Sequence, residues 1–221
     1  MYKNRISKIY NRLSNFKNNH QSLFLTSSFQ TQSLVLLKII SEYYNSIPIY
    51  FINTSFHFPE TIEYKNSLKS ILNIQIIDIS SDTILLNQFD SRNRLLYTSD
   101  TDRCCEINKT GPLKSIINIH DVWITGIRND QTTYRKKSKK IEKIQGGKIK
   151  YNPLIEWTKN EVQDYIAFYK LPRHPLDSTD LMSIGCEPCT RLIKNKKRED
   201  GRWFGQTKTE CGLHLNFKET L

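Results

Sequence analysis

The five cysteines of this 221-residue chain are the side chains with the clearest capacity for chemistry. Four of them form two pairs: Cys104 and Cys105 are adjacent, and Cys186 and Cys189 have CxxC spacing. Two thiolates two residues apart can bind one metal ion or one edge of a cluster. Adjacent side chains diverge, so a single zinc ion would strain the first pair, whereas a cubane offers several irons. The pattern favours an iron–sulfur cluster, with zinc and unliganded thiols as the alternatives.

The fifth cysteine, Cys211, has no partner thiol and lies in KTECGLH, ten residues from the C-terminus. Lys208 and His214 are close to it in the sequence, and cationic neighbours favour the thiolate form of a cysteine. Gly212 permits a tight bend beside it. We interpret Cys211 as a nucleophile on a segment that moves between a pocket and a second partner. A spare surface cysteine is the alternative.

The elements that must position these thiols alternate between strands and helices. Apolar, β-branched runs predict four buried strands, at residues 22–27, 47–53, 74–79 and 121–127. Helical spacing follows the first strand, Pro59 begins a helix after the second, and a capping box of Thr158 and Glu161 begins another. This alternation predicts an α/β fold with a doubly wound, mostly parallel sheet.

We expect one domain with three parts. Residues 1–20 have the apolar spacing of an amphipathic helix, residues 21–182 form the α/β core, and residues 183–221 form an irregular segment held by the cysteines and ending in a mobile tail. The stretch from Tyr134 to Lys150 is dense in lysine and arginine and contains two glycines. It is predicted to be a flexible, solvated loop.

Small polar and basic residues follow the predicted strands. Ser27 and Ser28 end the first strand, Thr54 follows the second, and Arg128 follows the fourth. Ligands of parallel sheets bind beyond the carboxyl ends of the strands. Hydroxyl groups and free backbone N–H groups at a helix start suit a phosphate, although serine and threonine are also ordinary helix caps. We therefore expect these loops to converge on one pocket for an anionic ligand.

The composition narrows the classes of partner. The chain is 38% hydrophobic and 25% charged, with a formal net charge of +11, which favours a phosphorylated or sulfated substrate, a nucleic acid or an acidic protein. No stretch has the length and apolarity of a membrane span, so we expect no membrane partner and a cytoplasmic protein with reduced thiols. The odd number of cysteines also argues against a closed disulfide framework.

Eight segments together resemble the assimilatory adenylylsulfate (APS) and phosphoadenylylsulfate (PAPS) reductase family. They run in order from residue 27 to residue 214: SSFQTQS, NTSFHFPET, DRCCEINKTGPL, WITGIRNDQ, NPLIEWT, SIGCEPCTR, GRWFG and KTECGLH. The combination of CC, CxxC and ECGLH resembles the iron–sulfur type that reduces adenosine 5′-phosphosulfate with thioredoxin. The resemblance implies a PP-loop sheet of the adenine nucleotide alpha hydrolase-like type, with residues 21–182 as the nucleotide-binding part.

The resemblance also implies a reaction. Cys211 would attack the sulfur of adenosine 5′-phosphosulfate, AMP would leave, and an S-sulfocysteine would remain until thioredoxin, or a glutaredoxin-like reductant, releases sulfite. This is a step of sulfate assimilation toward cysteine. The four paired cysteines, Cys104, Cys105, Cys186 and Cys189, would hold a [4Fe-4S] cluster. Its role would be electrostatic, because thiol–disulfide chemistry already supplies both electrons.

The family's functional residues can be carried over to matching positions of this chain. Lys109 would bridge the cluster and the substrate, Ser27 and Ser28 would line the phosphosulfate site, and Thr54 would lie near the nucleotide. The residues expected to contact phosphate or sulfate oxygens are Arg128, Arg202 and His214, with arginine suited by its planar fork. From the residues alone, Lys109 is equally compatible with a solvated lysine on a helix.

The chain departs from the family pattern at three places. Gln30 replaces the glycine that the family's SSFG loop uses for close backbone approach to the phosphate. Asp180 and Leu181 stand where Gly-Tyr is common before SIGC. Glu199 replaces a second arginine near GRW, and Arg198, one position away, is a possible substitute.

Three alternatives accompany this interpretation. One is an iron–sulfur enzyme that prefers PAPS, which the basic charge permits. Another is a zinc-containing PP-loop protein that binds nucleic acid through RKKSKKIEK and KNKKRED. Those runs lack interleaved aromatic residues, and that function leaves Cys211 without a role, so a nucleic-acid partner is disfavoured. A protein that keeps the fold without turnover is disfavoured because all five cysteines are present.

Overall fold

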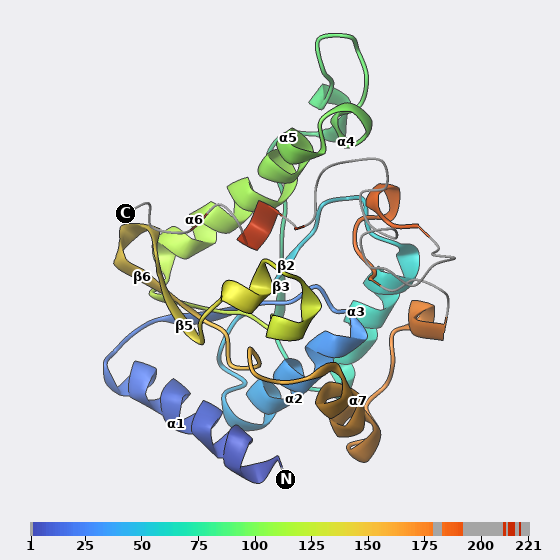
Figure 1. Cartoon of the computed structure of the whole chain (residues 1–221). Coiled ribbons are helices and arrows are strands. Elements are labelled where there is room, and N and C mark those ends of the chain that lie inside the picture. Colours follow the sequence, from blue (N-terminus) through green and yellow to red (C-terminus); the bar gives the residue numbers. More distant parts are fainter. Residues whose placement is uncertain (1, 179–182, 192–209, 211, 215–216, 218–221) are drawn as a thin grey trace.

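One sheet forms the centre of the molecule (Figure 1). The computed structural model describes residues 2–178, 183–191, 210, 212–214 and 217. The strands of that part of the chain are ordered β3-β2-β1-β4-β6-β5, and all neighbours are parallel except β5 and β6. Their bounds are β1 Leu23–Thr26, β2 Ile49–Ile52, β3 Ile76–Ile79, β4 Val122–Ile124, β5 Ile141–Ile144 and β6 Lys148–Tyr151. The predicted mostly parallel sheet is confirmed, and each of the four predicted strands contains the observed one.

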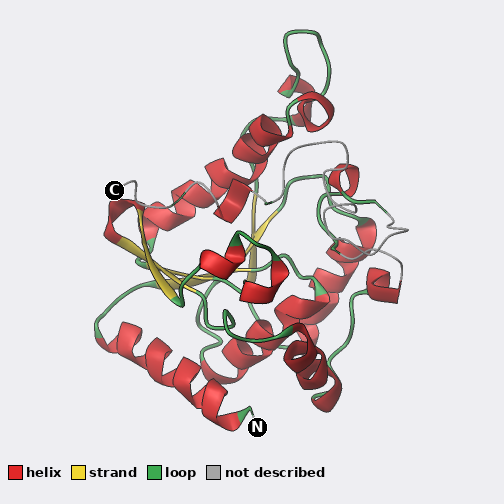
Figure 2. Ribbon diagram, viewed as in Figure 1, coloured by secondary structure: helices red, strands yellow, loops and turns green. Residues whose placement is uncertain are grey.

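Helices cover both faces of the sheet (Figures 1 and 2). The described α-helices are α1 Lys3–Asn18, α2 Leu34–Tyr43, α3 Pro59–Ile71, α4 Leu96–Ser99, α5 Thr101–Cys105, α6 Gly111–Ile119 and α7 Lys159–Phe168. None of the helices described is long and apolar enough to cross a membrane. The division into residues 1–20, 21–182 and 183–221 stays a prediction, because much of the last part lies outside the described residues.

Alternation along the strands produces two cores of unequal size, because successive strand residues point to opposite faces. Leu23 and Leu25 of β1 belong to the larger core, which also contains apolar residues of α1, α2, α3 and α7. Phe24, between them, belongs to the smaller core with Leu113 of α6 and Phe217. The sheet is therefore anchored on one face by four helices and on the other by α6 and a residue close to the C-terminus.

Two helices, α1 and α7, form where local sequence patterns predict them. The buried side chains of α1 recur at helical spacing and are Ile6, Ile9, Leu13 and Phe16. At the start of α7, the Glu161 amide donates to Thr158 Oγ1 (3.2 Å), and Glu161 Oε2 accepts from the Thr158 amide (2.8 Å). Both predictions from the sequence, the amphipathic first helix and the capping box, are confirmed.

The prediction of a flexible loop between Tyr134 and Lys150 is wrong. This stretch contains β5 and β6, which pair antiparallel at the edge of the sheet. Gly146 and Gly147 form the turn between them, with φ values of +74° and +68° that other residues adopt at a cost. The glycines therefore connect two strands rather than loosen a loop.

Some of the basic side chains of this stretch form ion pairs within the fold, whereas Lys136, Lys137, Lys139 and Lys143 are exposed. Lys150 is 3% exposed, lies 5.3 Å from the centre of the Trp123 ring, and forms an ion pair with Glu142 (Nζ–Oε2 3.3 Å). Lys148 pairs with Asp121 (Nζ–Oδ1 3.3 Å). Long cationic side chains can cover apolar surface while their charged ends find partners. The density of charge misled the prediction because it hid the strand pattern beneath it.

One helical run carries the first cysteine pair and Lys109. It consists of α5, a π-helical turn over Glu106–Thr110, and α6. Single π-helical turns inside helices are rare and frequently occur at functional sites. Here the turn contains Lys109, and it changes the direction in which residues after the cysteines project relative to a regular helix.

Candidate active site

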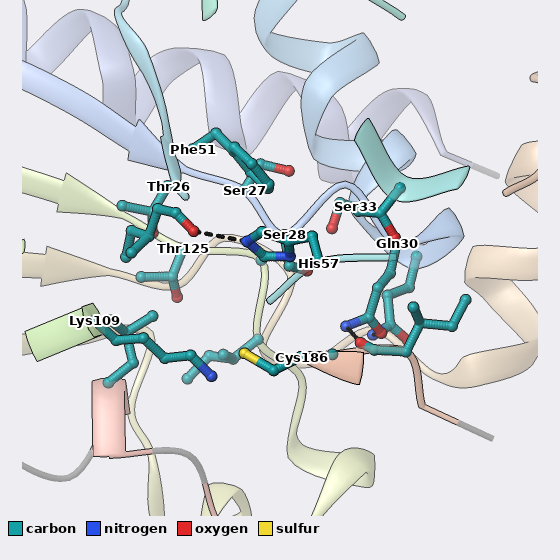
Figure 3. Close-up of a pocket in the computed structure, with 18 of the residues that line it drawn as sticks. Thr26, Ser27, Ser28, Gln30, Ser33, Phe51, His57, Lys109, Thr125 and Cys186 are labelled. Carbon is teal, nitrogen blue, oxygen red and sulfur yellow. Dashed lines mark hydrogen bonds between the residues drawn. The ribbon is translucent and has the colours of Figure 1, made fainter. Parts of the chain in front are cut away.

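The central pocket lies beyond the carboxyl ends of β1, β2 and β4 (Figure 3). Ser27 and Ser28 line it after β1, Ile52 and His57 after β2, and Thr125 after β4. The predicted convergence of these three loops is confirmed. The position follows from the sheet, because the carboxyl ends of parallel strands leave a crevice at one edge.

Segments distant in the sequence complete the same pocket. They contribute Lys109 from the π-helical turn, Arg135 from the segment after β4, Gly185 and Cys186 from the CxxC segment, and Leu213 from the tail. Lys109 and several hydroxyl groups therefore face one space, together with Arg135, whose charge is balanced by an ion pair with Glu210. This lining suits an anionic ligand better than an apolar one.

The turn after β1 explains how the chain tolerates Gln30. Phe29, not Gln30, has the left-handed conformation, with φ of +52°. Its amide donates to Ser27 Oγ (3.1 Å), and its fully buried ring packs against Phe51 (centroids 5.6 Å). Gln30 is extended, so its backbone does not require glycine, and its side chain donates from Nε2 to the Ile184 carbonyl. Gln30 thus connects this turn to the CxxC segment.

His57 is a pocket residue that the sequence analysis did not single out. Its Nε2 lies 3.0 Å from the Ile52 carbonyl and 3.3 Å from the Thr54 amide nitrogen. Burial, assisted by the charges of Lys109 and Lys65, lowers the pKa of His57 to about 4. The imidazole is therefore neutral near pH 7. The signal available was its place in HFPET, directly before the helix that begins at Pro59.

All four paired cysteines line a second cavity, the cysteine cavity. Cys104 and Cys105 project into it from α5, and Cys186 and Cys189 from either end of the Glu187–Cys189 turn. The four thiols are free of disulfides, and all but Cys189 are buried. The chain thus brings together two pairs that are about 80 residues apart in sequence.

The second pair is held by the loop that follows β2. Cys186 forms an isolated antiparallel bridge with His57, and the Glu187 amide donates to the Phe56 carbonyl (2.7 Å). Thr54 Oγ1 lies 3.3 Å from Cys186 Sγ. The loop beside the central pocket therefore also fixes the position of the CxxC thiols.

The four thiols have the donor chemistry of an iron–sulfur cluster, and a four-thiolate zinc site is the alternative. No group of three or more described His, Cys, Asp or Glu side chains is arranged to hold one metal ion. The cysteine cavity nevertheless offers four thiols and no nitrogen or carboxylate ligand from the residues that line it. An all-thiolate set around a shared cavity is the donor chemistry of iron–sulfur clusters. Burial raises the pKa of Cys104, partly offset by a hydrogen bond from Asn108, so a bound cation would be needed to keep this thiolate ionised.

Comparisons with known proteins agree with this arrangement. The profile of the phosphoadenosine phosphosulfate reductase domain matches residues 22–192. The chain belongs to this reductase family. The adenosine 5′-phosphosulfate reductase of Chelativorans sp. (strain BNC1) is 36% identical over 197 residues, which is 88% of this chain and 80% of that protein. That of Mesorhizobium japonicum is 35% identical over 201 residues, covering 89% and 78%. The family inferred from the sequence motifs is confirmed.

Solved structures show the same fold. A phosphoadenylyl-sulfate reductase from Candida auris, in a phosphate complex, has a TM-score of 0.60 at 23% identity and covers 75% of this chain and 81% of its own. An FMN adenylyltransferase from Candida glabrata has a TM-score of 0.62 at 14% identity, covering 89% and 70%. At these identities the likeness concerns the fold alone. The reductase therefore has the predicted PP-loop type of sheet.

Lys109 stands between the two cavities of this reductase. Only Lys109 and Cys186 line both the central pocket and the cysteine cavity among the residues described for either. In Figure 3 their side chains extend toward the same part of the pocket, opposite Ser28 and His57. A cation at this wall can interact with an anion on one side and with thiolate-bound charge on the other. Lys109 thus lines both cavities, and its bridging role stays a prediction.

The other predicted site residues have different positions. Thr54 lines the cysteine cavity rather than the central pocket, and it is 2% exposed. Arg128 is not among the residues that line the central pocket: it is buried, and its Nε donates to Asp130 Oδ1 (2.9 Å). Arg135, which the sequence analysis left in the basic loop, lines the pocket instead. Nothing in that lysine-rich stretch distinguished it from its neighbours.

Several predictions fall on positions without described geometry. His214 belongs to the short turn Gly212–His214, but its side chain is outside the described part of the structure. The remaining predicted or departing positions outside the described residues are Cys211, Arg202, Asp180, Leu181, Arg198 and Glu199. The roles given to these residues stay predictions.

Proposed function

We propose that this protein reduces adenosine 5′-phosphosulfate to sulfite and AMP, with thioredoxin or a glutaredoxin-like protein as reductant. The observation that carries the proposal is the wall shared by the two cavities, where Lys109 lies between a pocket suited to an anion and four clustered thiols. The names of the bacterial relatives support the choice of substrate. The reaction would take place in the cytoplasm as a step of sulfate assimilation toward cysteine.

The reaction balances with thioredoxin as the source of two electrons. The Cys211 thiolate attacks the sulfate sulfur, the bond from that sulfur to the bridging oxygen breaks, and AMP leaves with the bonding pair. A thioredoxin thiolate then attacks Sγ of the modified Cys211, which forms a mixed disulfide and displaces sulfite. The second thioredoxin thiol resolves the mixed disulfide, which restores Cys211 and oxidises thioredoxin by two electrons.

The residues of the central pocket would bind and orient the substrate. The Ser27 and Ser28 hydroxyls would donate hydrogen bonds to the phosphosulfate oxygens, and Lys109 would offset its negative charge as the leaving group departs. Arg202 and His214 are proposed to contact the same oxyanion groups. For Arg128 the proposal is an indirect contribution, because its guanidinium is paired with Asp130.

The cysteine cavity would hold a [4Fe-4S] cluster on Cys104, Cys105, Cys186 and Cys189. When bound, the cluster would supply local electrostatics and would fix the C-terminal segment to the sheet. It would not need to supply electrons, because the two thiols of the reductant provide both. The Lys109 ammonium group would then interact electrostatically with the cluster on one side and with the substrate on the other.

Two alternatives now have different support. A nucleic-acid-binding role is disfavoured because it leaves Cys211 without a role and because the basic runs lack interleaved aromatic residues. Within the first of these runs, Arg135 is held in a buried ion pair. A preference for PAPS is compatible with the same pocket chemistry, since that substrate differs by one further phosphate. We favour adenosine 5′-phosphosulfate because the bacterial relatives are named for it.

The direct test is the intact mass of the anaerobically purified protein after incubation with adenosine 5′-phosphosulfate and no reductant. We expect one sulfite-mass adduct that maps to Cys211, is absent from Cys211→Ser, and disappears when reduced thioredoxin is added. A parallel incubation with PAPS compares the two substrates. An adduct with PAPS alone would reassign the substrate, and no adduct with either would overturn the proposed reaction.

A further inference from the structure

A buried ion pair joins the residue before Cys211 to the wall of the central pocket. Arg135 donates from Nε to Glu210 Oε2 (2.9 Å) and from Nη2 to Glu210 Oε1 (2.7 Å), which is a two-bond fork. The two side chains are 8% and 2% exposed. Thr132 Oγ1 donates a third hydrogen bond to Glu210 Oε2 (2.9 Å). Such bidentate pairs fix the mutual orientation of their partners as well as their distance.

The arginine of this pair is itself held in place. Gln131, which also lines the central pocket, accepts a hydrogen bond from Arg135 Nη1. The same Gln131 oxygen accepts from the Arg128 amide (2.9 Å). Arg135 therefore presents a fixed fork at the pocket wall, and Glu210 docks against a surface that is already organised.

The residues around Cys211 share this location. Glu210 and Gly212 are buried on either side of it, and Leu213 lines the central pocket. Consecutive Cα atoms are separated by 3.8 Å, so an anchor at Glu210 restricts the space available to the Cα atom of the next residue. The anchored residue, Glu210, thus directly precedes the proposed nucleophile in the chain.

We propose that Glu210 is a positioning residue, whose ion pair with Arg135 seats the Cys211 segment at the central pocket. The inference rests on the proposed function, since it assigns Cys211 to the reaction. Positioning a nucleophile accounts for a large part of catalysis, and displacement by about 1 Å can slow a reaction on the order of a hundredfold. Loss of the pair should therefore lower kcat more than it raises KM.

The chain offers a matched control in Glu142. This carboxylate is also largely buried and paired with a cation, Lys150, with side-chain exposures of 13% and 4%. It lies in β5 and does not line either cavity. Glu142→Gln therefore reports what the loss of a largely buried, paired carboxylate costs the fold when it lines neither cavity.

The experiment compares Glu210→Gln, Glu142→Gln and the unaltered protein, all loaded with the cluster, in two measurements. The first is the rate of S-sulfo adduct formation on Cys211 at saturating adenosine 5′-phosphosulfate, with the concentration dependence. The second is the rate at which iodoacetamide alkylates Cys211 without substrate. We expect Glu210→Gln to slow adduct formation about tenfold or more, with less than about a threefold change in KM. We also expect it to change the rate of Cys211 alkylation severalfold. Glu142→Gln should change neither.

Other outcomes decide against the inference. If Glu210→Gln raises KM alone, the pair organises Arg135 for substrate binding and does not seat the tail. If it behaves like Glu142→Gln in both measurements, positioning is excluded. Should Glu210→Gln not fold by circular dichroism, Glu210→Asp, which keeps the charge and shortens the side chain by one methylene, gives the same comparison. If the unaltered protein forms no adduct, the proposed function fails separately, and the alkylation rates still judge the anchor.

Discussion

The two cysteine pairs of this reductase reach the same cavity by different physical means. Cys104 and Cys105 belong to α5, whose own hydrogen bonds set their directions, starting with Asp100 Oδ1, which accepts from the Arg103 amide (2.9 Å). Cys186 and Cys189 flank a single short turn, and their position depends on contacts to the loop after β2. One pair is thus placed by secondary structure and the other by tertiary contacts.

The side-chain hydrogen bonds around each pair show the opposite division. Asn108, one turn after Cys104, forms reciprocal amide hydrogen bonds with Gln88 (3.0 and 2.6 Å) and donates to Cys104 Sγ (3.6 Å). At the second pair, Thr190 Oγ1 donates to the Cys186 carbonyl (2.8 Å) and accepts from the Gly185 amide (3.2 Å). The first arrangement joins two segments, whereas the second closes a local turn. Because the backbone of Cys186 and Glu187 is held by contacts to the loop after β2, we expect the second pair to depend more on the proposed cluster.

The largest expected effect comes from removing a ligand of the proposed cluster. Cys104→Ser and Cys186→Ser should each reduce bound iron more than tenfold, because the remaining ligands cannot complete the set. Hydrogen exchange should then rise most in residues 183–191 and least in α5, which keeps its own helical hydrogen bonds. The measurement is iron content together with exchange mass spectrometry. Equal loss of protection in both segments would show that α5 too depends on the cluster.

The wall between the cavities gives the next effect. Lys109→Met should slow adduct formation about ten- to a hundredfold, because it removes the cation that faces both the substrate and the thiols. Lys109→Arg keeps the charge and should lose less. Single-turnover kinetics of both variants, with iron content as a control, checks this. If Lys109→Met loses iron but the iron-loaded fraction reacts normally, the lysine serves the cysteine cavity alone.

The helix-borne pair can be probed through its buried amide. Asn108→Leu should destabilise the protein by about 1–3 kcal/mol, because Gln88 is left buried without its partner. The double variant Gln88→Leu with Asn108→Leu should recover part of this stability, since neither amide is then left without the other, although the Thr83 carbonyl loses its bond from Gln88. Urea unfolding of the cluster-free protein measures both. No recovery in the double variant would mean that the Asn108 contact to Cys104, not the amide pair, provides the stability.

The smallest effect is expected at the turn of the second pair. Thr190→Val keeps the shape of the side chain and removes two hydrogen bonds, so it should cost about 1 kcal/mol. We expect the Glu187–Cys189 turn to depend on the proposed cluster. Thr190→Val should therefore release iron to a chelator severalfold faster than the control Thr54→Ser, which retains a hydroxyl beside Cys186. Chelator kinetics tests this. Equal rates would remove the distinction between the two pairs.

Much of the site could be predicted from the sequence, and the misses share a cause. The loops after β1, β2 and β4 converge as predicted, because parallel strands end at one edge. The position of Arg135 and its pairing with Glu210 were missed, because they lie 75 residues apart and neither belongs to a periodic pattern. The loop prediction for residues 134–150 failed for a similar reason, since charge density concealed strands whose pairing is tertiary.

The sequence by itself determined the family, the class of sheet and which four cysteines form the two pairs, because motifs and periodicity are local properties of the chain. Only the tertiary structure decided which residues share a wall. It placed Lys109 at the wall of two cavities and put Arg135, rather than Arg128, in the lining of the central pocket. It also put the left-handed backbone at Phe29, one residue before the position where the family pattern has glycine. These outcomes depend on packing between segments distant in the sequence, and no local pattern encodes such packing.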